Sequence, residues 1–313
     1  MKKITLRSFA KINLSLDVTG RRPDGYHTVD MIMQQVALHD KVTVSWEKGP
    51  DWEIRLTTNR SYLPVDERNL AYRGALVIKE YLEEKGLSPL RGRIGIHVDK
   101  RIPVAAGLAG GSGNGAVVML ALNHLMKLDL SVSRLMELGA PLGADVPFCI
   151  MGGARSNLLL GEKMNQDPMA SSCGRATGIG TELEPVRPGL DAFVVLTKPS
   201  IRVSTREVYQ GLELDKIEEH PDNGELVEGL RENNLFKVTK NMVNLLEIVT
   251  LKRYPIVVYT KNKVSERGNP LKVLMSGSGP TIFAIYTNRN KAESAKESLK
   301  KINRETYLTR TTL

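Results

Sequence analysis

The segment that most restricts what this chain can fold into is PVAAGLAGGSGNGA, a run of small residues at positions 103–116. Alternating apolar residues before it predict a strand over 94–98, and the apolar stretch after it predicts a helix from Ala116 to Lys127. Glycines let backbone N–H groups converge on an anion, and the amino end of a helix adds a favourable dipole. We therefore expect a phosphate-binding loop that leads into a helix capped by Ser112 or Asn114.

Two common nucleotide-binding patterns fit this loop poorly. It lacks the lysine of GxxxxGK[ST], so it is not a Walker-type P-loop. Residues 111–116 formally match GxGxxA, but the dinucleotide-binding version needs a strand that runs directly into the first glycine, and Pro103 to Gly110 intervene. A dinucleotide-dependent oxidoreductase remains an alternative from the residues alone, as does a turn that binds no ligand.

The N-terminal segment has the strongest strand signal. Apolar and polar residues alternate from Ile4 to Leu16, which is the period of a half-buried strand. Lys11 and Asn13 share its more polar face, about 6.5 Å apart at a rise of ~3.3 Å per residue. Gly20 to Gly25 contains a Pro-Asp pair between glycines and predicts a turn.

The rest of the chain mixes strand and helix patterns. Further strands are expected at residues 42–46 and 54–56, interpreted as a pair, and at 192–196, 271–275 and 281–286. Helices are expected at residues 70–85, 133–138, 234–247 and 289–302. Such interleaving, without repeats, indicates the α+β class.

Charge and cysteine content limit the function classes. The net charge of +9 favours anionic partners or a basic surface, and the basic residues form no dense run of the kind that binds nucleic acid. Two cysteines without metal-ligand spacing predict neither a disulfide framework nor a zinc site. We find no signal-peptide pattern and no apolar segment that approaches the ~20 residues of a membrane span, so a cytoplasmic protein is expected.

Four segments together resemble the GHMP kinase family. The glycine-rich loop is similar to the second motif of these kinases, and three further segments occur in the family's order. They are AKINLSLDVTGRRPDGYHTVD (10–30), LGADVPFCIMGG (142–153) and LMSGSGPTIFAIY (274–286). The Asp-Gly-Tyr-His stretch and VSTREVY (203–209) resemble the branch that acts on a cytidine-diphosphate-linked methylerythritol, and the resemblance covers nearly the whole chain.

The resemblance implies a two-domain α+β fold with the active site in the interdomain cleft. We divide the chain into an N-terminal domain at 1–155, an apparent insertion loop at 156–175 and a C-terminal domain at 176–313. The family resemblance also predicts helix at 255–259, where propensity alone favours a strand. The implied reaction moves the γ-phosphate of ATP to the 2-hydroxyl of the cytidine-linked substrate with Mg²⁺, in the synthesis of isoprenoid precursors. A monomer or weak dimer is expected.

The resemblance assigns two catalytic residues. Asp145 is expected to be the base that accepts the hydroxyl proton, and Lys11 the cation beside the acceptor oxygen. From the residues alone, an aspartate shortly before Pro147 is more typical of a helix start, and Lys11 of an exposed strand face.

The resemblance also assigns the binding residues. ATP is expected at Pro103, Val104, Ala105, Ala106, Gly107, Leu108, Ala109, Gly110, Gly111, Ser112 and Gly113, with Lys100 and Asn69 on the adenosine side. The cytidine-linked substrate is expected at Asn13, Tyr26, His27, Thr205 and Tyr209, and the third-motif loop is Gly277, Ser278 and Gly279. Core packing is the alternative for the aromatic residues. No dedicated cluster of metal ligands is expected.

The sequence departs from the family pattern at two places. Gly113 and Gly115 stand where the branch usually has a serine and a small apolar residue, and a glycine in a helix costs up to ~1 kcal/mol relative to alanine. The apparent insertion at 156–175 is expected to be a surface loop. A non-catalytic GHMP-like nucleotide-binding protein, or a GHMP kinase for another small alcohol, are the alternatives that these departures leave open.

Overall fold

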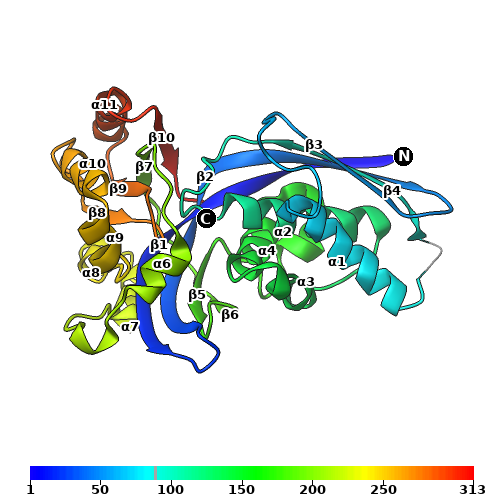
Figure 1. Cartoon of the computed structure of the whole chain (residues 1–313), viewed down its shortest axis with the longest axis horizontal. Coiled ribbons are helices and arrows are strands. Elements are labelled where there is room, and N and C mark those ends of the chain that lie inside the picture. Colours follow the sequence, from blue (N-terminus) through cyan, green and yellow to red (C-terminus); the bar gives the residue numbers. More distant parts are fainter. Residues whose placement is uncertain (88–89) are drawn as a thin grey trace. The chain divides into compact units, whose positions relative to one another are not determined.

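Two long antiparallel strands, β1 (Lys2–Arg21) and β2 (His27–Lys48), open the fold (Figure 1). The structure is a computed structural model that describes residues 1–87 and 90–313. The predicted strand and the turn after it are confirmed: the Arg22 N–H donates to the Tyr26 carbonyl at 2.8 Å, and the Asp24 carboxylate accepts the Tyr26 N–H at 3.1 Å.

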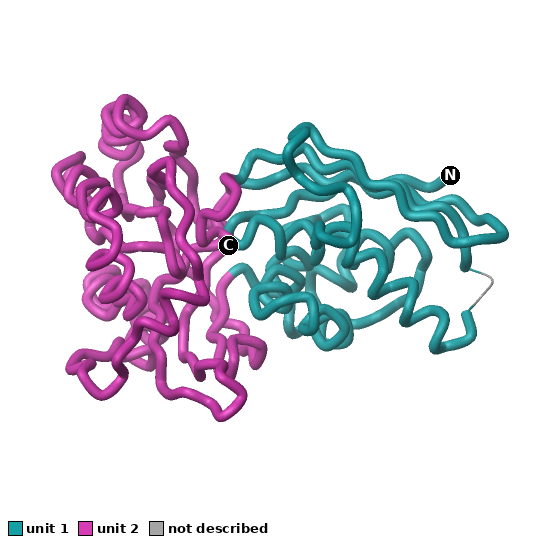
Figure 2. The backbone as a smooth tube through the Cα atoms, in the orientation of Figure 1, with its two compact units in different colours: residues 1–10, 39–102, 109–172 teal, residues 11–38, 103–108, 173–313 magenta. Residues whose placement is uncertain are grey.

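The chain forms two compact units, drawn in different colours in Figure 2. Unit 1 comprises Met1–Ala10, His39–Ile102 and Ala109–Ser172, and unit 2 comprises Lys11–Leu38, Pro103–Leu108 and Cys173–Leu313. Because β1 and β2 are long, each contributes residues to both units. The compact units therefore do not follow the continuous ranges 1–155 and 176–313, which remain a prediction about family domains.

In unit 1, the sheet has the order β3 (Glu53–Thr58), β4 (Gly92–Asp99), β2. β3 runs parallel to β4, and β4 runs antiparallel to β2, with Val44 opposite Ile96. The predicted pairing of residues 42–46 with 54–56 is wrong, because β4 lies between these strands. Parallel strands need a crossover connection, and the helix between β3 and β4 provides it.

Four helices cover one face of this sheet: α1 (Leu70–Glu84), α2 (Gly110–Met126), α3 (Val132–Gly139) and α4 (Asp145–Ser156) (Figure 1). A short 3-10 turn, Ala140–Leu142, joins α3 to the segment before α4. The prediction for α2 is wrong at its start, since the helix begins six residues before Ala116. Glycine's low helix propensity is overridden here by close packing.

The prediction that residues 156–175 form a surface loop is wrong. It holds a 3-10 turn (Leu158–Leu160), helix α5 (Glu162–Asn165) and the start of β5 (Cys173–Thr177). The buried Asn157 side chain donates to the Gly153 carbonyl at 2.9 Å, and Asn165 donates to the Ala154 carbonyl at 2.6 Å. These amides satisfy carbonyls at the end of α4, which fixes the segment against the helix that precedes it.

Unit 2 contains an antiparallel sheet in the order β10 (Glu305–Arg310), β7 (Phe193–Lys198), β9 (Ile282–Tyr286), β8 (Lys272–Met275). Helices α10 (Pro255–Ser265) and α11 (Arg289–Lys300) pack on it. Separately, β5 pairs with residues 31–34 of β2 and with β6 (Glu182–Pro185). The remaining short helices are α6 (Thr205–Gln210), a 3-10 turn (Leu214–Lys216), α7 (Asn223–Arg231), α8 (Leu235–Lys240) and α9 (Glu247–Arg253).

Two helix predictions in unit 2 have opposite outcomes. The helix expected from propensity at 234–247 is wrong, because α8 ends at Lys240 and α9 begins at Glu247. The helix expected from the family resemblance at 255–259 is confirmed in α10, against local β propensity. Within the described residues, no helix has the length and apolar character needed to cross a bilayer.

Candidate functional site

The first half of the glycine-rich loop lies against the third-motif loop within unit 2. The Ser276 hydroxyl donates to the Gly107 carbonyl at 2.9 Å. Gly107 has a φ of +72°, and a Cβ there would collide with the Ser276 carbonyl oxygen. The Asn244 amide donates to the carbonyls of Met275 and Gly277 at 2.8 Å each. Segments nearly 170 residues apart thus hold each other in place.

Lys11 and Asn13 lie beside these two loops, also in unit 2. The Lys11 backbone N–H donates to the Leu108 carbonyl at 3.2 Å, and its ammonium donates to Asn13 Oδ1 at 2.7 Å. Both side chains are buried, at 4% and 0% exposure, so the alternative of an exposed strand face for Lys11 is wrong. Asn13 Oδ1 lies 3.7 Å from the position that a Cβ on Gly277 would take. The fold therefore gathers a buried cation, an amide and two glycine loops.

Two of the predicted substrate residues form an aromatic pair. The rings of His27 and Tyr209 have centroids 5.3 Å apart at an angle of 40°. Burial lowers the pKa of His27, and the nearby Arg21 lowers it further, which favours the neutral imidazole with one donor and one acceptor. Tyr26 is 65% exposed at the tip of the β1–β2 turn. The alternative of core packing is therefore wrong for Tyr26, and its ring is available to a ligand.

Thr205 begins α6 and contacts the third motif. Its hydroxyl and that of Ser278 lie 2.8 Å apart, and the Thr250 hydroxyl donates to the Ser278 carbonyl at 3.2 Å. Ser278 is buried, with 6% of its surface exposed. The predicted substrate segment 203–209 and the third-motif loop are therefore directly connected.

The second half of the glycine-rich loop starts α2 in unit 1. Ala109 precedes the helix in the left-handed region, with φ +53°, and no side chain caps the helix. The predicted capping by Ser112 or Asn114 is wrong, because both lie inside the first turns. Ala105 is also left-handed, at φ +52°, and such backbone costs a non-glycine residue roughly 1–2 kcal/mol. Strain of this kind concentrates at functional loops, and the first N–H groups of a helix have no partner within it.

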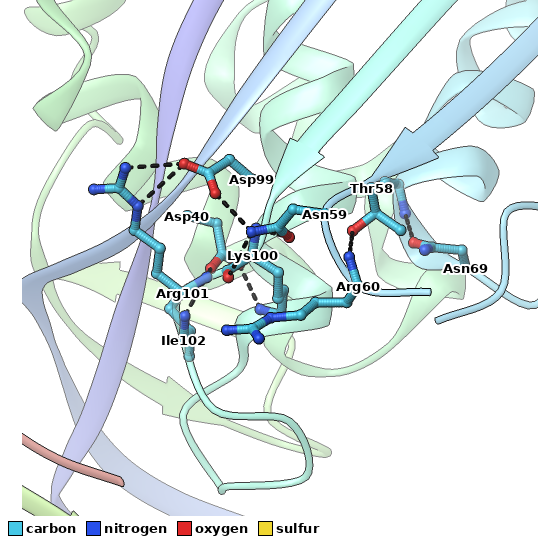
Figure 3. A network of polar contacts seen from close by, with 10 residues as sticks. Asp40, Thr58, Asn59, Arg60, Asn69, Asp99, Lys100, Arg101 and Ile102 are labelled. Carbon is cyan, nitrogen blue, oxygen red and sulfur yellow. Dashed lines mark hydrogen bonds and ion pairs between the residues drawn. The ribbon is translucent and has the colours of Figure 1, made fainter. Parts of the chain in front are cut away.

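Lys100 is buried near the start of α2. Its ammonium is ion-paired with the fully buried Asp40 (Figure 3). A Cβ on Gly110 would lie 2.6 Å from Lys100 Nζ and 3.0 Å from Cγ2 of Ile102, so only glycine fits at that position. Lys100 is therefore not a surface residue.

Asn69 is the cap of α1. Its Oδ1 accepts the Ala71 N–H at 3.0 Å, and its Nδ2 donates to the Pro64 carbonyl at 2.8 Å. The side chain thus orders the loop before α1. A contact between Asn69 and adenosine stays a prediction.

Asp145 is the first residue of α4 and is half-buried. The Val146 N–H donates to the Gly143 carbonyl at 3.0 Å, which closes the turn before the helix, and Pro147 occupies a position in the first turn that needs no donor. A carboxylate at a helix amino end is stabilised by the helix dipole. Asp145 belongs to unit 1 and Lys11 to unit 2.

The glycines that depart from the family pattern sit where chain segments of unit 1 come very close. A Cβ on Gly113 would lie 2.6 Å from Ser8 Oγ, and one on Gly115 would lie 2.8 Å from the Leu70 carbonyl oxygen. On the facing helix, a Cβ on Gly74 would lie 2.5 Å from the Gly115 carbonyl oxygen. Gly74 and Gly115 let α1 and α2 pack backbone to backbone, and Gly113 leaves room for the Ser8 hydroxyl.

We expect Gly113→Ser to lower the free energy of unfolding by about 1–3 kcal/mol, because the added side chain overpacks a filled site. Urea unfolding would measure it. Gly111→Ser is the matched control, since the nearest atom to a Cβ there is Leu70 Cδ1 at 3.6 Å. Adding Ser8→Ala to Gly113→Ser should recover part of the loss. Equal stability of the two single variants would contradict this account of Gly113.

Motif reasoning did not identify Asp40, Asn244 or Ser8. Each is a single polar residue in an apolar or amphipathic stretch, and each acts through contacts with segments distant in sequence.

The chemistry of the assembled groups suits a polyanion. Backbone donors, a buried ammonium and the N-terminus of α2 can bind phosphates, and carboxylate and hydroxyl oxygens suit Mg²⁺. Over residues 1–87 and 90–313, no three His, Cys, Asp or Glu side chains lie together as a metal site.

Two family models match the chain. The model of the GHMP kinases N terminal domain matches residues 69–153, and that of the GHMP kinases C terminal domain matches residues 214–304. Both matches fall inside the predicted ranges 1–155 and 176–313, and neither reaches residues 156–175.

The matches to similar proteins cover nearly the full length of this chain. A 4-diphosphocytidyl-2-C-methyl-D-erythritol kinase of Alkaliphilus metalliredigens is 45% identical over 308 residues, which is 98% of this chain and 96% of that protein. The kinase of the same name in Alkaliphilus oremlandii is 43% identical, over 99% of this chain and 97% of its own. A crystal structure of 4-(cytidine 5'-diphospho)-2C-methyl-D-erythritol kinase matches with a TM-score of 0.76 at 28% identity, covering 99% of this chain and all of that one.

Proposed function

The chain belongs to the GHMP kinase family, and we propose that it phosphorylates the 2-hydroxyl of 4-diphosphocytidyl-2-C-methyl-D-erythritol with ATP. It is an enzyme of the small-molecule kinase class with an alcohol group as acceptor, and it acts in the synthesis of isoprenoid precursors. The observation that carries the proposal is the 45% identity to a kinase of this name over 98% of the chain. In addition, Lys11, Asn13, the first half of the glycine-rich loop and the third-motif loop lie in one unit.

ATP binding is assigned to the glycine-rich loop and the start of α2. The helix amino end offers backbone donors to the phosphates at Gly110, Gly111 and Ser112, and Lys100 supplies a positive charge close to Gly110. Mg²⁺, when bound with ATP, neutralises charge on the phosphates, and the half-exposed Ser112 hydroxyl is the protein oxygen that we assign to it.

Asp145 and Lys11 are the proposed catalytic residues. Asp145 accepts the proton of the acceptor hydroxyl, and Lys11 stabilises the negative charge that develops on that oxygen. Asn13 holds the Lys11 ammonium at 2.7 Å, so the direction of the cation is fixed before substrate binds. Such fixed charges stabilise the transition state without reorganisation during the reaction.

The cytidine end of the substrate is assigned to Tyr26, His27, Tyr209 and Thr205. An exposed tyrosine and a second tyrosine paired with a histidine offer stacking faces and hydrogen-bond partners to a pyrimidine. The connection of Thr205 to Ser278 places this segment next to the third-motif loop.

The direct test is incubation of the purified protein with ATP, Mg²⁺ and 4-diphosphocytidyl-2-C-methyl-D-erythritol, followed by mass analysis for the 2-phosphate. Product formation supports the proposal. ATP hydrolysis that is stimulated only by other small alcohols would assign a different acceptor. Nucleotide binding without any turnover would favour a non-catalytic relative and would direct attention to Gly113 and Gly115.

Tyr209→Ala should raise KM for the cytidine-linked substrate by about tenfold or more, because base–aromatic stacking contributes roughly 1–3 kcal/mol. KM for ATP should not change. Steady-state kinetics with each substrate varied in turn measures both values. Tyr259→Ala removes a half-exposed tyrosine on α10 and is the matched control. A Tyr209→Ala enzyme with unaltered KM for the cytidine substrate would remove this residue from the site.

A further inference from the structure

Asp40 is a fully buried carboxylate in β2 whose two oxygens accept three hydrogen bonds from consecutive residues (Figure 3). Its Oδ2 accepts from the Lys100 ammonium. Its Oδ1 accepts from the backbone N–H groups of Arg101 at 2.7 Å and Ile102 at 2.8 Å. One side chain therefore fixes the whole segment between the end of β4 and the glycine-rich loop.

This segment is also fixed from its other side. Asn59 Oδ1 accepts the Lys100 N–H at 2.8 Å, and Asn59 Nδ2 donates to Asp99 Oδ1 at 2.8 Å. The Lys100 side chain then reaches the first residue of α2, where a Cβ on Gly110 would lie 2.6 Å from its Nζ. The ammonium is thus aimed at the helix amino end by a backbone that Asp40 and Asn59 hold.

The charges around Lys100 make it depend on Asp40. Lys100 is 5% exposed, and burial lowers its pKa. The neighbouring Arg60 also lowers it, whereas Asp40 opposes both by its charge and hydrogen bond. Asp99 is already paired with Arg101 at 2.9 Å. In the part of the chain that the structure describes, Asp40 is the carboxylate that forms an ion pair with Lys100.

We propose that Asp40 is a positioning residue for ATP: its ion pair holds the Lys100 ammonium at the start of α2, and its carboxylate sets the backbone from which the glycine-rich loop begins. This inference rests on the proposed function, because it requires Lys100 and the loop to bind the nucleotide. The Asp40 side chain is fully buried. It acts through Lys100 and through the two backbone groups that its carboxylate binds.

Asp40→Asn removes the negative charge of the Asp40 side chain while nearly preserving its shape. The amide oxygen can still accept the N–H groups of Arg101 and Ile102, but an NH₂ group then faces the Lys100 ammonium. KM for ATP should rise about tenfold to a hundredfold, which is the loss seen when a group that orients a metal-binding side chain is removed. KM for the cytidine-linked substrate should not change, and kcat should fall much less than KM for ATP rises.

The pH profile separates positioning from simple loss of stability. Without Asp40, the two influences that raise the pKa of Lys100 are lost, so its pKa falls further. The lysine then loses its proton as the pH rises, and ATP affinity of Asp40→Asn should weaken from neutral to alkaline pH more steeply than in the wild type. Lys100→Met should bind ATP weakly at every pH, and the double variant should match Lys100→Met.

Three results would overturn the inference. One is an Asp40→Asn protein of lower thermal stability whose KM for ATP and pH profile are those of the wild type. Another is a double variant in which the two losses add. The third result comes from Asn59→Ala, which loosens the same segment from its exposed side and serves if Asp40→Asn does not fold. An unchanged KM for ATP in Asn59→Ala would also reject the positioning role of Asp40.

A control and a binding assay complete the design. Glu305→Gln removes the acid from the Lys198 ion pair of 2.9 Å in unit 2 and should leave KM for ATP unchanged. ATP binding measured by calorimetry distinguishes the two hypotheses. If the wild type binds ATP but does not phosphorylate the cytidine-linked substrate, the proposed function fails. If the wild type phosphorylates it and Asp40→Asn binds ATP normally, the positioning role fails alone.

Discussion

Replacing Asp145 with asparagine should lower kcat for phosphoryl transfer by about 10²–10⁴-fold, the contribution typical of a positioned general base. Asparagine has nearly the same shape and can remain at the first position of α4. It cannot accept the hydroxyl proton. ATP binding should therefore persist while turnover fails. Rapid-quench measurement of a single turnover, together with calorimetric ATP binding, would separate these effects.

The matched control for Asp145→Asn is Glu162→Gln. Glu162 is also an acidic residue in the first turn of a helix, α5, and it is exposed. Both substitutions remove one carboxylate from the first turn of a helix, so a general effect of losing an acidic side chain would appear in both. A drop in kcat for Asp145→Asn alone assigns the effect to chemistry. If Asp145→Asn retained more than a tenth of the wild-type kcat, Asp145 would not be the base.

The sequence predicted correctly those elements whose formation depends mainly on neighbouring residues, such as β1 and α1. The alternation from Ile4 to Leu16 is a property of β1 itself, and the Asn69 cap and Gly86 fix the ends of α1. Two other features are set by contacts with distant segments. β4 separates the strands at 42–46 and 54–56, and α2 begins at Gly110 although glycines disfavour helix there. Those glycines are compatible with helix because other segments of unit 1 pack against them.

The candidate site shows the same division. Motif order identified Lys11, Asn13, Gly107 and Gly277, and unit 2 brings them together. Motifs could not predict Asp40, because a lone aspartate in a strand has no signal until its partners are known. The prediction for residues 156–175 is wrong for a related reason. The segment is expected to be a surface loop because it interrupts the family pattern, whereas its amides bind the last carbonyls of α4.

Replacing Lys11 with methionine should lower kcat by about 10²–10³-fold, the loss typical of removing one group that stabilises developing oxyanion charge. Methionine keeps an unbranched stem of similar length in this buried position, so the surrounding strand can keep its packing. KM for ATP should change little, because the substitution removes charge stabilisation at the acceptor oxygen. Single-turnover rates and the two KM values measure the outcome.

Lys198→Met is the control that makes the Lys11 result interpretable. Lys198 is a buried lysine of unit 2, 7% exposed, whose ammonium donates to Glu305 at 2.9 Å. Its loss leaves a half-exposed carboxylate without its partner and should reduce stability without reducing kcat. Because both variants remove a buried lysine, a general effect of charge loss would appear in both. Equal losses of kcat would show that Lys11 has no special role, whereas a loss confined to Lys11→Met places its ammonium at the reacting oxygen.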